Sequence, residues 1–307
     1  MRTRDASLLL LLSAIWGSAF LFNHVVVRDV PPFMVVAGRL VIAAIIVAPI
    51  AARNGGVLPP RTAWVTLLFL AVVNNVIPFT LITAAQQHIS SSLAATLIAT
   101  MPLFVLVFTF AAGTERPDAE RVVGLLLGFV GAAVVVGPDA GDITGSSAIG
   151  DLAVIAAAAC YGLSTVVARQ KAHGAALSLA SGQMIFGALV AVPLALGIDG
   201  APDLHISLKA ALSWLGLGAL CSGMAYVIFF SLLQRLSATQ VSVTTYIIPI
   251  VAALLGWLVL DESIGLNLAA GLALIVIGVA GVNGGLRRGW LLVRGTRTES
   301  GAGAPGR

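Results

Sequence analysis

The sequence predicts an all-α integral membrane protein whose ten transmembrane helices form two inverted five-helix repeats. Hydrophobic residues make up 59% of the 307 residues and charged residues only 10%, a composition typical of chains that fold in a lipid bilayer. Ten apolar windows are long enough to cross a bilayer as helices, at about 20 residues per crossing. The second half of the chain also repeats residues of the first half at a fixed distance.

The ten apolar windows justify one helix each. In chain order they are 8–27, 33–52, 64–83, 93–112, 122–137, 149–168, 177–196, 208–232, 239–260 and 266–284. The fifth window is the shortest, so we expect its helix to differ most from the window at its ends. The first window follows two arginines, as a secretory signal does. Its Trp16 has a counterpart in Tyr161 in the middle of the chain, so we expect a retained helix.

The internal repeat sets the domain organisation. Six pairs of identical residues recur at a spacing of 147 positions: Gln87 and Gln234, Ser90 and Ser237, Pro102 and Pro249, Glu115 and Glu262, Gly124 and Gly271, and Gly131 and Gly278. With five helices in each repeat, the second copy is upside down in the membrane relative to the first. The expected parts are a first repeat at 7–137, a linker loop at 138–148, a second repeat at 149–284 and a basic tail at 285–307.

Glycines are spaced for close helix contact in the last window of each repeat. Gly124, Gly128 and Gly131 lie in the fifth window, and Gly271 and Gly278 lie in the tenth. Small residues at such spacings let helix backbones approach one another in a membrane. We expect these two helices to pack together as scaffold.

The basic residues predict the orientation, because Lys and Arg of short loops stay on the cytoplasmic side. Ten helices place both termini on one side, and that side carries Arg2, Arg4, Arg53, Arg61, Arg116, Arg121, Arg169, Lys171, Arg235, Arg287, Arg288, Arg294, Arg297 and Arg307. The other side carries Arg28 and Lys209. We therefore expect a multi-pass protein of the cell inner (cytoplasmic) membrane with both termini cytoplasmic. The net charge of +4 is explained by topology and by a tail that rests on anionic membrane lipids, without a nucleic-acid partner.

Several motifs resemble one known family. They are Trp16-Gly17 in the first helix, Gly38-Arg39 in the second, a proline inside the fourth and the ninth (Pro102 and Pro249), and the repeated acidic residue followed by two glycines. With these motifs the chain is similar to the drug/metabolite transporter superfamily, in its ten-helix form with two EamA domains. Within it, the chain most resembles exporters of amino acids, including aromatic ones. The resemblance implies a secondary transporter that works by alternating access and binds a small-molecule substrate.

A polar solute that crosses the bilayer needs amides, hydroxyls and free carbonyls along its path. A proline leaves the carbonyl four residues earlier without its donor, so we expect helix breaks at Pro78, Pro102 and Pro249; the alternative is that these prolines only kink helices for packing. Polar and aromatic residues on the same helices are the candidate cavity residues: Trp16, Asn23, Arg39, Asn74, Asn75, Phe79, Thr100, Met101, Tyr161, Ser164, Tyr226, Thr245 and Tyr246.

Arg39 is the one charged residue well inside a window. Isolating a cation in hydrocarbon is costly, so an intramembrane arginine indicates a function. One interpretation is that Arg39 attracts a substrate carboxylate. The other is that it snorkels and binds helix carbonyls near the interface. Its counterpart in the second repeat, at a spacing of 144, is the neutral Gln183.

No Asp or Glu lies well inside any window, and Asp151 lies near the end of one. Proton-coupled exporters of cations use such a carboxylate, so the sequence favours a facilitator of amino acids or similar zwitterionic metabolites. A proton-coupled exporter of other metabolites or drugs stays open as the alternative. Substrate, transport direction, coupling ion and oligomeric state are not determined.

Other classes of protein are disfavoured by the residues. The chain lacks the H-E-x-x-H, G-x-S-x-G and Walker A patterns of enzymes. Cys160 and Cys221 have neither disulfide nor metal-ligand spacing, so we expect no metal and no cofactor. A structural or receptor-like membrane protein that transports nothing is the remaining alternative.

Overall fold

The computed structural model describes residues 3–113, 118–136, 146–171, 176–201, 205–233, 235–236 and 244–282. The regular elements in this part of the chain are all helical. Seven helical stretches in it are long and apolar enough to cross a membrane, and two more are shorter apolar helices. With the 18-residue fifth helix, this is the ten-helix membrane protein with two inverted repeats that the sequence predicts.

The first repeat begins with two long helices, α1 (Thr3–Val26) and α2 (Pro32–Arg53). Its third span is composite, with η1 (Arg61–Ala63), α3 (Trp64–Ala71), the π-helical η2 (Val72–Val76) and α4 (Ile77–Ala85). Its fourth span consists of α5 (Ser91–Ile98) and α6 (Met101–Ala111), and its fifth is α7 (Ala119–Val136).

The second repeat follows the same plan. It begins with α8 (Ser146–Lys171) and α9 (Ala176–Ile198). Its third span contains α10 (Leu208–Gly216), the π-helical η4 (Leu217–Met224) and α11 (Ala225–Leu233), and its last two helices are α13 (Thr244–Leu260) and α14 (Leu266–Val282).

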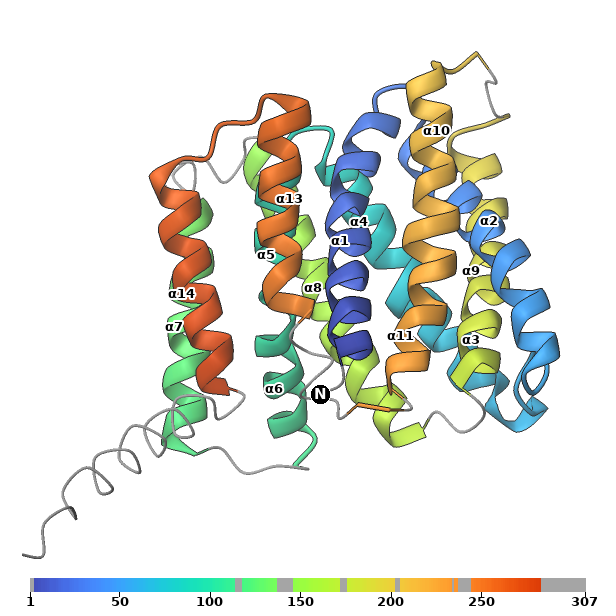
Figure 1. The fold of residues 1–307 in the computed structure, drawn as a ribbon, viewed down its shortest axis with the longest axis horizontal. Helices are drawn as coiled ribbons and strands as arrows, with labels where there is room; N and C mark the ends of the chain where they lie inside the picture. Colours follow the sequence, from blue (N-terminus) through green and yellow to red (C-terminus); the bar gives the residue numbers. More distant parts are fainter. Residues whose placement is uncertain are drawn as a thin grey trace, which may run out of the picture.

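Helices of the two repeats pack against each other throughout the bundle. α1 contacts α13, α2 contacts α9 and η4, and α4 contacts α8, as Figure 1 shows for the arrangement of these helices. One end of the bundle carries the start of α1, and we call it the N end; the loop between α13 and α14 lies at the opposite end (Figure 1). Large apolar side chains such as Ile45, Val65 and Leu189 are exposed on the outside, where a bilayer would cover them.

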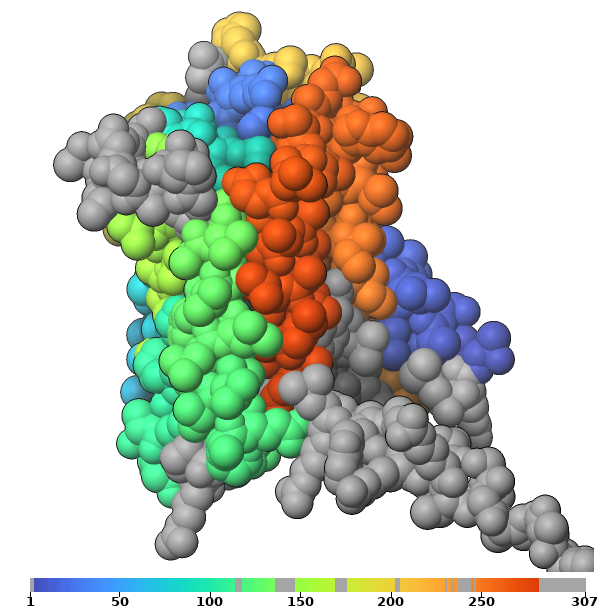
Figure 2. Space-filling model, turned by 90° about the vertical axis from the view of Figure 1, so that its left-hand side faces the viewer, coloured from blue at the N-terminus to red at the C-terminus, as the bar shows by residue number. Residues whose placement is uncertain are grey.

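α7 and α14 lie along each other at one side of the molecule (Figure 2). A Cβ atom added to Gly131 would lie 2.7 Å from the backbone nitrogen of Ile275, and one added to Gly278 would lie 2.6 Å from the carbonyl oxygen of Gly124. No side chain larger than that of glycine fits there without displacing the partner backbone. The predicted close packing of the fifth and tenth helices is confirmed.

The three prolines predicted to break helices lie in different settings. Pro102 occupies the first turn of α6, and α5 ends at Ile98 just before it, so the fourth span is interrupted there. Pro78 lies in the first turn of α4, directly after the π-helical η2. Pro249 lies inside α13, which continues from Thr244 to Leu260, so the expected helix break is not seen at this proline. A membrane helix tolerates a proline where neighbours satisfy the freed carbonyl.

The windows and the helices differ mainly at their ends. α7 begins three positions before its window, which is the fifth and shortest. α1 begins five positions before its window and so includes the buried Asp5, whereas the buried Asp151 of α8 already lies inside its window, near the start. The basic tail at 285–307 lies outside the described residues, as does most of the linker at 138–148.

Candidate functional site

Two adjacent asparagines of η2 form the centre of a polar cluster between the repeats. The Asn74 amide donates to Oε1 of Gln183 over 3.2 Å, and the Asn75 amide donates to the same oxygen over 3.5 Å. The Ser164 hydroxyl donates to Oδ1 of Asn74 over 2.7 Å, and the Tyr226 hydroxyl donates to Oδ1 of Asn75 over 3.2 Å. These bonds join η2 to α8, α9 and α11 of the other repeat.

Arg39 lies on α2 and is 9% exposed. Its Nε donates to the Ser222 hydroxyl of η4 over 2.6 Å. Its Cζ lies 3.7 Å from the centroid of the Phe79 ring, a distance typical of a cation–π interaction. Among the described residues, no carboxylate forms an ion pair with this guanidinium.

The residues of these two contacts are related by the repeat. Arg39 corresponds to Gln183 at a spacing of 144, and Asn75 corresponds to Ser222 at a spacing of 147. The bond from Arg39 to Ser222 and the bond from Asn75 to Gln183 therefore occupy equivalent places in the inverted pair. Each joins the second helix of one repeat to the π-helical turn of the other.

The π-helical turns themselves occupy equivalent positions, because η2 shifted by 147 residues falls within η4. Single π-helical turns inside α-helices are common at functional sites. Neither turn was predicted from the sequence. Gln183 and Ser222 were also absent from the predicted cavity residues, although their repeat relation to Arg39 and Asn75 would have indicated both.

Aromatic side chains lie beside the polar cluster. The Trp16 and Tyr226 rings are 6.5 Å apart between centroids in an edge-on arrangement. Tyr161 packs against both of the larger apolar clusters of the core, and its carbonyl accepts a bond from Ser164 over 2.9 Å. The structure thus brings together eight of the predicted residues: Trp16, Arg39, Asn74, Asn75, Phe79, Tyr161, Ser164 and Tyr226.

The other predicted residues lie elsewhere. The Asn23 amide of α1 donates to Gln86 over 2.6 Å and its oxygen accepts from Thr83 over 2.9 Å, so it belongs to a separate buried contact between α1 and the end of α4. Thr100 is buried and donates to the carbonyl of Leu97 in its own span over 2.7 Å. Met101 and Thr245 are half-buried, and the side chain of Tyr246 lies outside the described part.

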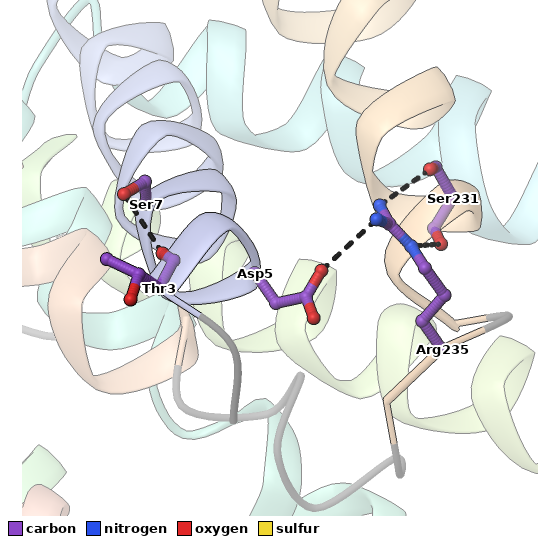
Figure 3. Close-up of polar contacts among 5 residues, drawn as sticks. All are labelled: Thr3, Asp5, Ser7, Ser231 and Arg235. Carbon is purple, nitrogen blue, oxygen red and sulfur yellow. Dashed lines mark hydrogen bonds and ion pairs between the residues drawn. The ribbon is translucent and has the colours of Figure 1, made fainter.

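An ion pair joins two spans at the N end (Figure 3). Nη1 of Arg235, just after α11, lies 3.2 Å from Oδ1 of Asp5 on α1. Arg235 also donates to the carbonyl and the hydroxyl of Ser231, over 3.1 and 3.0 Å. The Asp5 side chain is 8% exposed and that of Arg235 is 35% exposed, so the carboxylate is shielded from water while the guanidinium is partly in contact with it.

A carboxylate joins the loop between α13 and α14 to the first turn of α5 at the opposite end. Glu262, between α13 and α14, accepts from the backbone N–H groups of Ser91 and Ser92 over 2.7 and 3.1 Å, and from the Ser92 hydroxyl over 2.6 Å. These N–H groups belong to the first turn of α5, where no carbonyl within the helix can accept from them. Burial acts to raise the pKa of Glu262, but the bonds from Ser92 and Ser91 outweigh it and hold the pKa below its ordinary value.

No cluster of three or more His, Cys, Asp or Glu side chains suited to a metal ion occurs in the described ranges. The central cluster instead combines one cation with amides, hydroxyls and aromatic rings. Such a set of groups can bind a small solute through hydrogen bonds and charge.

Comparisons with known proteins agree with this arrangement. The family model described as the EamA-like transporter family matches residues 5–137 and 148–284. The chain is 24% identical over 269 residues to the uncharacterized transporter YoaV of Bacillus subtilis (strain 168), covering 86% of this chain and 91% of YoaV. It is 27% identical over 255 residues to the uncharacterized inner membrane transporter YedA of Escherichia coli (strain K12), covering 79% and 78%. One solved crystal structure of a protein resembles the fold with a TM-score of 0.68 at 21% identity, covering 94% of this chain and 99% of that one.

Proposed function

The chain belongs to the EamA-like transporter family and is therefore a membrane transporter, and we propose that it exports amino acids or similar small zwitterionic metabolites across the cytoplasmic membrane by alternating access. Membership of a transporter family is consistent with the absence of catalysis. The observation that carries the substrate class is the buried Arg39, which has no described carboxylate as partner.

A substrate carboxylate supplies the missing negative charge. The planar guanidinium binds a carboxylate through two parallel N–H donors, and in Arg39 the bond from Nε to Ser222 leaves the two terminal nitrogens for this role. The amide oxygens of Asn74 and Asn75 each accept one hydrogen bond within the cluster, and each has a second lone pair that can accept from a substrate ammonium group. The nearby rings offer π faces to the same group.

Alternating access requires that the two ends of the bundle close in turn around the central cluster. The Asp5–Arg235 pair joins α1 to the segment after α11 at the N end, and Glu262 joins its loop to the first turn of α5 at the opposite end. Both contacts consist of hydrogen bonds and charge interactions between different spans, which is compatible with contacts that break and re-form. We propose that the N end is cytoplasmic, from the distribution of Lys and Arg.

A proton-coupled exporter is the second candidate. Asp5 and Asp151 occupy equivalent positions of the two repeats, at a spacing of 146, and both are buried. Buried carboxylates in membrane helices can carry protons. The central cluster itself contains no carboxylate among the described residues, which favours the facilitator.

The test is transport by the purified protein in liposomes loaded with labelled L-phenylalanine. We expect efflux down the amino-acid gradient, without an imposed pH gradient, at a rate well above that of protein-free liposomes. A pH gradient alone should not drive accumulation of the amino acid, since the described residues of the central cluster include no carboxylate that could carry a proton. Proton-driven accumulation would favour the second candidate, and the absence of transport for every amino acid tested would refute the proposed substrate class.

A further inference from the structure

The central cluster divides into two halves of the same construction. The first, which we call the cationic half-site, consists of Arg39, Ser222 and Phe79. The second, the neutral half-site, consists of the repeat equivalents Gln183, Asn75 and Tyr226. Phe79 and Tyr226 correspond at the same spacing of 147 as Asn75 and Ser222. The pseudo-two-fold relation of the repeats therefore exchanges the half-sites.

The two half-sites differ in charge. The second helix of the first repeat supplies a guanidinium, and the second helix of the second repeat supplies an uncharged amide at the equivalent position. Arg39 is largely removed from water, and a buried cation is stable only with a compensating anion or strong hydrogen bonds. The cluster is thus polarised, with a positive end at Arg39 and a neutral end at Gln183.

On the basis of the proposed function, we propose that the Arg39/Gln183 pair determines substrate specificity. The substrate carboxylate binds the cationic half-site, and the opposite end of the substrate binds the neutral half-site. An arginine at position 183 can replace the arginine at position 39 in binding the carboxylate. Ser222 is a positioning residue, because its bond to Nε fixes the plane of the guanidinium and directs the terminal nitrogens to the carboxylate. Neither Gln183 nor Ser222 contributes a charge of its own.

Three related probes separate the charges of the substrate. L-phenylalanine carries both charges, 3-phenylpropanoate carries the carboxylate alone, and phenethylamine carries the ammonium alone. Binding to the purified protein is measured by isothermal titration. We expect the wild type to bind both carboxylates and to bind phenethylamine at least about tenfold more weakly, since one charge-assisted bidentate pair is lost.

Transposing the charge is the decisive experiment. Arg39→Gln should weaken the binding of L-phenylalanine and of 3-phenylpropanoate by about tenfold or more. Arg39→Gln combined with Gln183→Arg should restore most of the affinity for both compounds. The matched control combines Arg39→Gln with Gln87→Arg, which places a cation at an exposed position and should restore nothing. A folded Arg39→Gln/Gln183→Arg protein that binds no better than Arg39→Gln overturns the proposal. If this double variant does not fold, Gln183→Arg alone should strengthen 3-phenylpropanoate binding, and unchanged binding overturns the proposal equally.

Ser222 is tested by the ratio of affinities for 3-phenylpropanoate and phenethylamine. Ser222→Ala should reduce this ratio by about threefold to tenfold, since the guanidinium loses a hydrogen bond that orients it, whereas Ser222→Thr keeps the hydroxyl and should keep the ratio. A purely structural role would lower the melting temperature without changing the ratio, and that result would remove Ser222 from the proposal.

The outcomes also separate this proposal from the proposed function. Binding of 3-phenylpropanoate that depends on Arg39, together with no transport of any amino acid, would leave the half-sites standing and refute amino-acid export. Conversely, the protein could transport amino acids while Arg39→Gln leaves the ratio of affinities for 3-phenylpropanoate and phenethylamine unchanged. That result would support amino-acid export and refute the half-sites.

Discussion

Glu262 ties the last loop of the second repeat to the first turn of α5 in the first repeat. Ser90 caps the same turn, because its hydroxyl accepts from the backbone N–H of Leu93 over 3.2 Å. Glu262 and Ser90 together therefore satisfy three of the N–H groups that begin α5. The side chain of Glu262 also approaches Gly256 so closely that a Cβ atom there would clash with the carboxylate.

Removing the charge of Glu262 should lower stability in a pH-dependent way. We expect Glu262→Gln to cost roughly 1 kcal/mol at neutral pH, because the half-exposed carboxylate is partly screened by water. The pKa of this carboxyl is lowered in the folded protein, so its stabilisation is present above the ordinary value of 4.5 and is lost as the pH falls through the lower folded value. The measurement is the melting temperature of wild type and variant between neutral pH and pH of about 3.

The control for this experiment is Asp261→Asn, the neighbouring exposed acid of the same loop. It should have little effect at any pH, and asparagine tolerates the positive φ of 55° at this position. The difference in melting temperature between the wild type and Glu262→Gln could also stay constant across the pH range. That result would show that the charge of Glu262 does not stabilise the contact.

At the level of single residues, the sequence identified the polar groups whose cost in a membrane is highest. Arg39 and the Asn74–Asn75 pair stood out because few reasons other than function or tight pairing keep such groups in an apolar helix. Ser222 and Gln183 were missed because each contributes one short or neutral polar group, which a helix can bond to its own backbone. Which of these groups meet depends on how α2, α9 and the two π-helical turns pack, and that is not encoded in any single window.

At the level of elements, the Asp5–Arg235 pair joins α1 to the segment after α11. The backbone partners of Arg235 lie at the end of α11, so the guanidinium fixes that helix end and reaches α1 at the same time. Breaking the Asp5–Arg235 ion pair would let α1 and α11 separate at the N end. Cys221 of η4 is a native reporter of such opening, since its thiol is fully buried and lies next to Ser222 in the chain.

Breaking this pair should expose the centre of the bundle from the N end. In a protein with Cys160→Ala, we expect Asp5→Asn to raise the rate of N-ethylmaleimide modification of Cys221 several-fold. The reason is that loss of the ion pair should destabilise the closed N end relative to the open one by about 1 kcal/mol. The matched control is Arg121→Gln, which breaks the pair between Arg121 of α7 and Asp118, the residue just before that helix. An equal rate in the wild type and Asp5→Asn would exclude the pair as a contact that closes the N end.

The positions of the elements were predicted more fully than their internal geometry. Hydrophobic windows locate helices because bilayer thickness fixes the length of apolar sequence needed. They do not report a π-helical turn, which changes the hydrogen-bond register without changing composition, and so η2 and η4 went unpredicted. Pro102 and Pro249 illustrate the same limit, since repeat-equivalent prolines interrupt one span and leave α13 continuous.

At the level of the whole molecule, inversion explains why equivalent residues meet at the centre. An odd number of helices per repeat turns the second copy over, so the middle of the third span of one repeat lies at the same depth as that of the other. Arg39 and Gln183 are then brought to opposite sides of one site. The scaffold pair α7 and α14 joins the fifth helices of the two repeats through the equivalent glycines Gly131 and Gly278.

The orientation of this assembly in the membrane is the last prediction. The N end carries most of the basic residues that the sequence places in loops, so we expect it to face the cytoplasm. In a protein that lacks both native cysteines, Ser263→Cys in the loop between α13 and α14 should react with an impermeant thiol reagent applied to intact cells. Ala52→Cys, in the last turn of α2 at the N end of the bundle, should react only after the membrane is opened. Both positions are exposed, so a difference in reaction reports the side of the membrane, and the reverse pattern would place the N end outside and turn the proposed direction of transport around.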